Sequence, residues 1–294
     1  MMKRVSTPDL EIAYEDTGPK NGRPVVLVHG WPDDIHCWDR IVPELMTNGC
    51  RVITPYLRGC GPTQFLSSDT LRSGAIAALG EDLIQFIGRL DLEDVLVAGY
   101  DWGARAGYAA AALHPEPINV LLAMSAGYAT SVPLKSMSYE LAQAYWYEWL
   151  VAWKLGREAL NNDRQRLCRY LWKTWSPNWR FTEEEFSATA ASWNNPDWSE
   201  ISAHAYLQRW GEAEGAPEHR EAEERLAENP PINVPTIMLQ GAEDRCNLPE
   251  TSEGKERFFN NGYERKVLQG VGHFLPREAP GEVLSAIHRL RKEP

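Results

Sequence analysis

Residues 95–103 of the chain read VLVAGYDWG, an apolar run that ends in an aspartate between two glycines. The run VLVA predicts a buried β-strand, and the alanine-rich residues after Gly103 predict an α-helix, so Asp101 falls on the turn between them. In so tight a turn, side chains at Gly99 and Gly103 would collide with the neighbouring strand and helix. The turn should therefore lift the Asp101 carboxylate above the sheet, beside a helix N-terminus that stabilises an anion. Taken alone, this stretch is equally compatible with a plain strand–helix turn capped by an aspartate.

Strand-like and helix-like stretches alternate on both sides of this turn. Strands are predicted at residues 24–28, 51–54, 94–99, 120–124, 236–239 and 266–268, and helices at residues 71–90, 103–113, 252–259 and 280–291. Strands that alternate with helices at this spacing form βαβ units with right-handed crossovers. The predicted fold class is therefore α/β, with a mostly parallel, doubly wound sheet that carries helices on both faces.

The alternation stops between residues 129 and 230. This segment has few β-branched runs, is rich in Trp, Glu, Arg and Ala, and holds nine of the 12 tryptophans. Such a composition predicts helices, inserted as a cap into the α/β core. We therefore expect a core formed by residues 1–128 and 231–294, and a helical cap formed by residues 129–230.

Composition and charge argue against several classes of protein. The 294 residues carry a net charge of -11, which disfavours nucleic-acid binding because that affinity comes mainly from Lys and Arg contacts to phosphate. No apolar stretch is long enough to span a membrane, and residues 1–9 lack the apolar run of a signal peptide. The five cysteines are scattered, which favours free thiols in the cytoplasm. The sequence has no spacing typical of a metal site, so no metal is expected.

Three further motifs accompany the turn at Asp101. Residues 29–32 read HGWP directly after a predicted strand, residues 239–244 read LQGAED, and residues 269–274 read QGVGHF. The order of nucleophile, acid and histidine along the chain is that of the α/β hydrolases. With these motifs the sequence resembles the α/β-hydrolase superfamily over essentially its whole length, and specifically the branch that contains the epoxide hydrolases and haloalkane dehalogenases.

The resemblance implies a role for five residues. Asp101 would be the nucleophile, His273 the base that activates water, and Asp244 the acid that orients His273. The backbone N–H groups of Trp31 and Trp102 would form the oxyanion hole. A carboxylate is a poor acyl nucleophile but, held dry and aligned, it displaces a leaving group at saturated carbon. The product is an alkyl ester of Asp101, which water activated by His273 then hydrolyses.

The leaving group decides the activity. The oxygen of an epoxide departs as an alkoxide and needs a proton donor, a role that suits tyrosine because its hydroxyl is neutral at pH 7. The resemblance to epoxide hydrolases places two such donors on the cap, at Tyr147 and Tyr206, with Tyr145 as the rival for the first. Both tyrosines could instead be packing residues of the cap. The activity expected is the hydrolysis of epoxides to vicinal diols.

Two other functions stay open. Haloalkane dehalogenases share the Asp nucleophile and the Trp that follows it, and Trp31 or a cap tryptophan could supply a second N–H for a halide. A non-catalytic ligand-binding protein of the same fold is harder to reconcile with an intact set of Asp101, Asp244 and His273. Fluoroacetate dehalogenases resemble the chain in outline, but in them an arginine follows the nucleophile, where this chain has Trp102.

The expected partners are a small apolar epoxide and water. Trp31, Trp102 and Trp149 are expected to line a mostly apolar pocket beneath the Trp-rich cap. No cofactor is required, because water is the second substrate. The sequence does not decide between a monomer and a homodimer.

Overall fold

The computed structural model describes residues 1–130 and 137–291. In this part of the chain nine strands form one sheet in the order β1-β2-β4-β3-β6-β7-β8-β9, with β5 paired to β2. The strands are β1 (Lys3–Ser6), β2 (Leu10–Thr17), β3 (Pro24–Val28), β4 (Arg51–Pro55), β5 (Gln64–Phe65), β6 (Val95–Tyr100), β7 (Ile118–Met124), β8 (Thr236–Gly241) and β9 (Tyr263–Leu268). β2 pairs antiparallel with β1, β4 and β5, and all other pairs are parallel. The predicted mostly parallel α/β sheet is confirmed.

Several of the predicted elements differ from the observed ones, and the helix predicted at residues 71–90 begins only at Ile76. Every predicted core strand is present, whereas β1, β2 and β5 were not predicted. The helix predicted at residues 252–259 is wrong. Two short 3₁₀ turns stand there instead, at Pro249–Ser252 and Glu256–Phe258, on either side of Gly254. Gly254 has a φ of +65°, a left-handed conformation that ends a right-handed helix.

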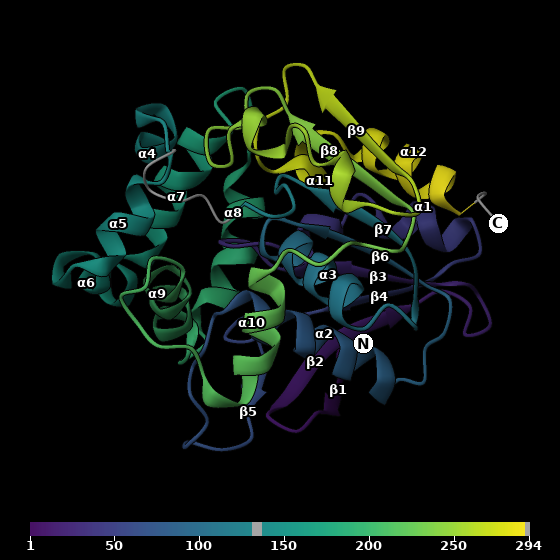
Figure 1. Ribbon diagram of the computed structural model, residues 1–294, viewed down its shortest axis with the longest axis horizontal. Coiled ribbons are helices and arrows are strands. Elements are labelled where there is room, and N and C mark those ends of the chain that lie inside the picture. Colours follow the sequence, from purple (N-terminus) through teal and green to yellow (C-terminus); the bar gives the residue numbers. More distant parts are fainter. Residues whose placement is uncertain (131–136, 292–294) are drawn as a thin grey trace.

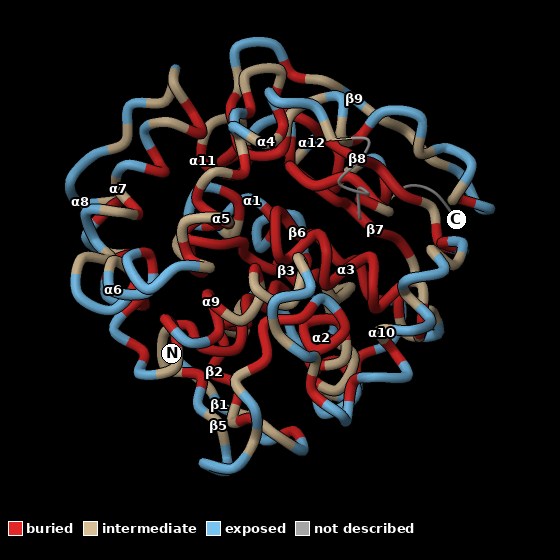
Figure 2. Tube along the Cα trace, turned by 60° about the vertical axis from the view of Figure 1, so that its left-hand side comes forward, coloured by how far each residue is buried: buried red, intermediate tan, exposed pale blue. Residues whose placement is uncertain are grey.

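Helices cover both faces of the sheet (Figure 1). The core helices are α1 (Val42–Thr47), α2 (Ile76–Arg89), α3 (Trp102–Leu113), α11 (Leu275–Glu278) and α12 (Pro280–Leu290). α2 packs against α3, which contacts β3, β6 and β7, while α12 contacts β6, β7 and β8, and α1 contacts β4. Figures 1 and 2 place the parallel strands between the α2–α3 pair and the helices α1 and α12. None of the helices in the described residues is long and apolar enough to cross a bilayer.

The central strands form the core of the molecule, drawn in red in Figure 2. All residues of β6 and β8 are buried, and in β3 only Pro24 is partly exposed. Strands that are covered on both faces are apolar along their whole length, without alternation. This is why they stand out in the sequence as continuous apolar runs.

In its described part, the segment between β7 and β8 consists of helices and the loops that join them. Its helices are α4 (Tyr139–Ala144), α5 (Trp146–Ala152), α6 (Lys154–Asn162), α7 (Arg164–Trp175), α8 (Glu183–Ala190), α9 (Trp198–Arg209) and α10 (Arg220–Ala227). In Figure 1, α4 to α9 lie together on the left of the sheet, whereas α10 contacts the core helices α2 and α3. Of the cap expected at residues 129–230, residues 131–136 lie outside the described part.

Buried hydrogen bonds fasten the cap helices to the loop that follows β3. Trp172 Nε1 donates to the carbonyl oxygen of Pro32 at 2.9 Å. The Ser192 hydroxyl donates to Oδ2 of Asp34 at 2.6 Å, and Asp34 is fully buried. Since this loop also carries Trp31, the position of the cap is tied directly to one side of the candidate site.

Candidate active site

Asp101 lies between the end of β6 and the first residue of α3, with a left-handed φ of 52° that non-glycine residues seldom adopt. The turn leaves no room at its two glycines. A Cβ on Gly99 would lie 2.2 Å from the carbonyl oxygen of Gly103, and a Cβ on Gly103 would lie 2.1 Å from the carbonyl oxygen of Val28. Both distances are far inside van der Waals contact, so the strand–turn–helix geometry expected from residues 95–103 depends on these glycines.

The two carboxylate oxygens of Asp101 have different surroundings. Oδ1 accepts a hydrogen bond from the backbone N–H of Trp31 at 2.9 Å. Oδ2 accepts a longer one from Nδ2 of Asn247 at 3.4 Å and lies 3.6 Å from Nε2 of His273. The residue is only 5% exposed. One oxygen is thus held by a main-chain donor, and the other faces the histidine.

His273 is held by Asp244 in the manner that the motifs predict. Its Nδ1 lies 3.0 and 3.1 Å from the two carboxylate oxygens of Asp244, and both residues are buried. Burial lowers the pKa of His273, but the charge and hydrogen bond of Asp244 and the charges of Asp101 and Glu278 together raise it by more, so that it lies above its ordinary value of 6.5. Nε2 has no hydrogen-bond partner among the described residues. The ring is therefore oriented through Nδ1 and can act as a base through Nε2.

Asp244 is itself fixed by three donors. Its Oδ1 accepts the backbone N–H groups of Cys246 and Asn247 at 2.8 and 3.0 Å, and its Oδ2 accepts Nε2 of Gln240 at 3.2 Å. Three donors from three different residues hold both oxygens of this carboxylate in one orientation. The tautomer and the direction of the His273 ring follow from that rigidity.

These groups meet because of the topology of the sheet. Trp31 follows β3, Asp101 follows β6, Asp244 follows β8, and His273 follows β9. The four strands are parallel, so their carboxyl ends lie along a single edge of the sheet, which is where open α/β sheets carry their sites. Trp102 is the first residue of α3, so its backbone N–H has no intrahelical acceptor and can serve an anion beside Asp101.

An aromatic cluster covers the carboxylate, with Trp31 at its centre. The ring of Trp31 lies 5.3 to 6.1 Å from five other rings, those of Trp102, Tyr147, Trp175, Trp198 and Tyr206. Its indole N–H donates to Oγ of Ser202 on α9 at 2.8 Å. Through these ring contacts, the cluster packs the loop after β3 and the start of α3 against the cap helices α5, α7 and α9.

Tyr147 and Tyr206 face each other within this cluster. Their rings lie 5.2 Å apart and nearly perpendicular, at 88°. Burial raises the pKa of each hydroxyl well above 10, and the negative charge of Asp101 adds to this shift in both cases. The Tyr147 hydroxyl donates to Oε1 of Glu148 at 3.2 Å. Both tyrosines are therefore protonated over the working pH range, as a proton donor must be.

Tyr145 and Trp149 lie elsewhere. The Tyr145 hydroxyl reaches Oδ1 of Asn247 at 3.5 Å, and its ring packs beneath Arg209 rather than on Trp31. Trp149 lies 4.3 Å from the ring of Trp210, and its indole N–H donates to the carbonyl oxygen of Ala142.

Trp149, which is expected to line the substrate pocket, packs on Trp210 outside the aromatic cluster around Trp31. Trp149 follows Tyr147 by two residues on α5, which places the two side chains on different faces of the helix. Since Tyr147 faces Trp31, Trp149 is turned away from the aromatic cluster. The structure does not bring it to Asp101.

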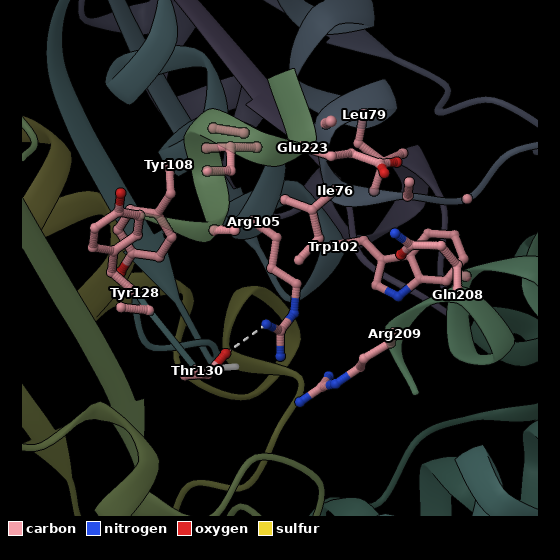
Figure 3. Close-up of a pocket in the computed structure, with 18 of the residues that line it drawn as sticks. Ile76, Leu79, Trp102, Arg105, Tyr108, Tyr128, Thr130, Gln208, Arg209 and Glu223 are labelled. Carbon is pink, nitrogen blue, oxygen red and sulfur yellow. Dashed lines mark hydrogen bonds between the residues drawn. The ribbon is translucent and has the colours of Figure 1, made fainter. Parts of the chain in front are cut away.

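A cavity of about 260 Å³ adjoins this cluster between α2, α3, α9 and α10. Trp102 and Tyr206 belong to both the cluster and the cavity wall. Arg105 and Arg209 both line the cavity, and Figure 3 shows the hydrogen bond from the Arg105 guanidinium to Thr130. Most residues that line the cavity are apolar, and the two basic side chains add positive charge to its wall.

Several residues of the site carry no sequence motif. Asn247 joins the nucleophile to the acid: its N–H donates to Asp244, and its side-chain amide donates to Asp101 and to the carbonyl oxygen of Ser125. Cys246 lies at hydrogen-bond distance from the Tyr147 hydroxyl, at 3.5 Å. Their proximity to Asp244 in the sequence is the signal that could have suggested them.

One group of side chains in the described residues has the arrangement of metal ligands. Oxygen, sulfur and nitrogen atoms of Asp101, Cys246 and His273 all lie within 4.8 Å of one another. Burial raises the pKa of the Cys246 thiol well above 9, whereas a metal binds the thiolate. The same atoms of Asp101 and His273 serve the nucleophile and base geometry described above, which needs no metal.

The sequence and the fold both have known relatives. Residues 23–280 match the family described as alpha/beta hydrolase fold. The chain is 25% identical to the AB hydrolase superfamily protein YfhM of Bacillus subtilis, over 95% of this chain and 93% of that protein. It is 21% identical to epoxide hydrolase A of Mycobacterium tuberculosis, over 96% of this chain and 94% of that protein.

Solved structures extend this likeness. A Klebsiella pneumoniae protein proposed to be an epoxide hydrolase has a TM-score of 0.92 at 34% identity, covering 98% of this chain and 96% of that chain. Potato epoxide hydrolase I has a TM-score of 0.81 at 18% identity, covering 100% of this chain and 99% of that chain. At the lower identity the likeness concerns the fold alone.

Proposed function

The chain belongs to the α/β-hydrolase fold family, and we propose that it hydrolyses epoxides to vicinal diols through an ester of Asp101. One observation carries the proposal: a buried carboxylate at the turn, between the Trp31 N–H and His273, lies under a cluster that contains two protonated tyrosines. The relatives named as epoxide hydrolases support the same substrate class.

In the first step, Oδ2 of Asp101 attacks a carbon of the epoxide. The C–O bond of the ring breaks as the ester bond forms, and the epoxide oxygen takes a proton from Tyr147 or Tyr206. Because Oδ1 is held by the Trp31 N–H, the carboxylate is fixed in one orientation. Such alignment in a water-poor site is what makes a weak nucleophile effective.

In the second step, water attacks the ester carbonyl carbon of Asp101. His273 accepts the proton from water through Nε2, and Asp244 stabilises the resulting imidazolium. Negative charge develops on Oδ1, where the N–H groups of Trp31 and Trp102 act as donors, each contributing on the order of a hundredfold to the rate. Collapse of this intermediate breaks the bond between Cγ and Oδ2 of the ester. Of the two protons of the attacking water, one, carried by His273, restores the tyrosine, and the other passes from the new carboxyl group to the departing alkoxide, which releases the diol and regenerates the Asp101 carboxylate. Water and the epoxide are the only reactants, so no cofactor is required.

Dehalogenation is the second candidate, because the site offers a donor that a halide would use. Nε1 of Trp175 is buried and has no hydrogen-bond partner among the described residues. The ring of Trp175 lies 4.8 Å from Tyr147 and 5.1 Å from His273. A departing halide needs N–H donors rather than a proton. The indole of Trp31 is a weaker candidate halide ligand, since its N–H already donates to Ser202.

A paired assay on one preparation distinguishes the two functions. Diol formation from styrene oxide and halide release from 1,2-dibromoethane are measured with the wild type and with Asp101→Ala. If the wild type forms diol but releases no halide, and Asp101→Ala forms no diol, the result supports epoxide hydrolysis. Halide without diol replaces the proposal by dehalogenation, and diol formation that survives in Asp101→Ala overturns the mechanism.

A labelling experiment tests the ester itself. In a single turnover with enzyme in excess and water enriched in ¹⁸O, the ester route puts the label into the carboxylate of Asp101, because the diol takes its new oxygen from the protein. Direct attack by water on the epoxide would instead label the diol. Mass spectrometry of the peptide that contains Asp101 separates the two routes.

A further inference from the structure

The cavity beside Trp102 contains a buried positive charge that no carboxylate neutralises. Arg105 lies on α3 one turn after Asp101 and is 8% exposed. Its Nη1 donates to Oγ1 of Thr130 at 2.8 Å, and its Nη2 donates to Oδ1 of Asn247 at 3.3 Å. Both acceptors are neutral, and no acidic side chain forms an ion pair with Arg105 anywhere in residues 1–130 and 137–291. A guanidinium cannot lose its proton, and a buried charge without a counter-ion is costly.

The other charged side chains of the cavity do not supply that counter-ion. Arg209 is paired with the buried carboxylate of Glu148 at 3.3 Å, so those two charges offset each other. Glu223, on α10, lies in Figure 3 on the side of the cavity opposite to Arg209 and the tip of Arg105. The end of the cavity near Thr130 therefore carries one net positive charge, that of Arg105.

The positive end lies close to the nucleophile. The side chain of Asn247 accepts from Arg105 and donates to Oδ2 of Asp101, so a single amide group separates the guanidinium from the carboxylate. Trp102 and Tyr206 line the cavity and also belong to the aromatic cluster around Trp31. A molecule bound in the cavity with an anion at Arg105 would reach Tyr206 and Trp102, the residue next to the nucleophile.

We infer that the cavity binds the carboxylate of a small epoxy acid, with Arg105 as the counter-ion. The inference rests on the proposed function for the reaction, and it replaces the neutral epoxide expected from the tryptophan content. A carboxylate matches the planar fork of a guanidinium with two parallel hydrogen bonds. A volume of about 260 Å³ suits a small acid rather than a long lipid chain.

Long-range attraction does not explain such binding. The chain has a net charge of -11, which repels an anionic substrate at a distance. Recognition must come from short contacts inside the cavity, where burial strengthens them. Affinity for the acid should therefore depend on Arg105 and only weakly on ionic strength.

A pair of nearly isosteric epoxides tests the inference: 3-phenylglycidate, which carries a carboxylate, and 3-phenylglycidamide, which does not. The ratio of their kcat/KM values is measured for the wild type, Arg105→Met and Arg105→Lys. The ratio cancels general damage to the site. We expect the wild type to prefer the acid by roughly tenfold or more, Arg105→Met to lose that preference, and Arg105→Lys, which keeps the charge, to retain part of it.

A binding measurement on the same proteins separates this inference from the proposed function. The melting temperature is recorded with 3-phenylpropionate and with 3-phenylpropanamide, neither of which can react. Stabilisation of the wild type by the acid alone, lost in Arg105→Met, supports the anion site even if no epoxide is turned over. Equal effects of acid and amide on the wild type, with equal turnover of the two epoxides, overturn the anion site and leave epoxide hydrolysis intact. The wild-type comparisons decide the matter even if Arg105→Met does not fold.

Discussion

Nε2 of His273 lies 3.6 Å from Oδ2 of Asp101, a separation that puts the base beside the nucleophile without a hydrogen bond between them. The opposite ring nitrogen is held by Asp244 at 3.0 Å. A histidine bonded tightly to the carboxylate would compete with the substrate for Oδ2. Here the hydrogen bond between Nδ1 and Asp244 orients the imidazole, and Nε2 is free to accept a proton from water once the ester has formed.

Replacing His273 by Gln should stop the reaction at the ester. The first step needs only the carboxylate and a proton donor, whereas the second needs a base, and loss of a general base costs about 10²–10⁴ in rate. Intact-protein mass spectrometry after addition of styrene oxide should show an increase equal to one substrate molecule. The double variant Asp101→Ala/His273→Gln is the control, and an adduct that persists in it would identify a different nucleophile.

The pH dependence of the second step should follow the titration of His273. In the free enzyme its pKa is raised above 6.5 because Asp244, together with the charges of Asp101 and Glu278, outweighs the effect of burial. The ester removes the charge of Asp101, so the pKa of His273 is lower in the ester than in the free enzyme. Only the neutral ring can accept a proton, so hydrolysis of the ester should be slow at low pH and rise as pH increases through the pKa that His273 has in the ester. Rapid-quench measurement of ester decay between pH 5 and about pH 9 records this rise in rate, the acidic limb of the pH profile.

Asp244→Asn provides the comparison for that measurement. The variant removes the charge that raises the pKa of His273 and leaves the burial that lowers it, so the acidic limb should move to lower pH. The maximal rate should also fall, because the amide no longer favours the productive tautomer. An acidic limb at the same pH in both proteins would mean that another group controls the step.

The residues that the sequence predicts best are those whose geometry is set by neighbours along the chain. Asp101 is held by its own turn, and the glycines at 99 and 103 that make this turn are visible in the sequence. Asp244 and His273 likewise follow directly from the ends of β8 and β9. The buried parallel strands are apolar throughout, so they too are recognisable.

The residues that were missed or misplaced depend on contacts between distant segments. Arg105 and Asn247 are 142 positions apart and meet only in the folded chain. The composition of the cap does not say which face of α5 meets Trp31, so it could not indicate that Tyr147 lies against Trp31 while Trp149 packs on Trp210. The strands β1 and β2 are defined by antiparallel pairing at the side of the sheet, and no local apolar run marks them as strongly as it marks the central strands.

Removing the hydroxyls of Tyr147 and Tyr206 should slow the first step selectively. Both side chains stay protonated because burial raises the pKa of each well above 10. We expect Tyr147→Phe and Tyr206→Phe each to lower the rate of ester formation by roughly tenfold or more, and the double variant to lower it by about 10²–10⁴.

Tyr145→Phe is the matched control for these variants. It removes a hydroxyl that donates to Oδ1 of Asn247, whose amide also donates to Asp101, so we expect a loss in the rate of ester formation that is smaller than the loss in Tyr147→Phe or Tyr206→Phe. Pre-steady-state measurement of ester accumulation in the His273→Gln background isolates the step. If Tyr145→Phe is the slowest of the three single variants, the donor has been assigned to the wrong tyrosine.

The turn that carries Asp101 should tolerate no side chain at its glycines. A Cβ would lie 2.2 Å from a carbonyl oxygen at Gly99 and 2.1 Å from one at Gly103. Neither oxygen can move without shifting β3, β6 or α3, so each change to Ala should lower the free energy of unfolding by about 3 kcal/mol or more. The matched control is Gly88→Ala on α2, where a Cβ would meet nothing within 4 Å and should stabilise the helix by about 0.5–1 kcal/mol. Urea denaturation of the three variants measures these differences, and a Gly99→Ala protein as stable as the wild type would show that the turn has more room than its geometry implies.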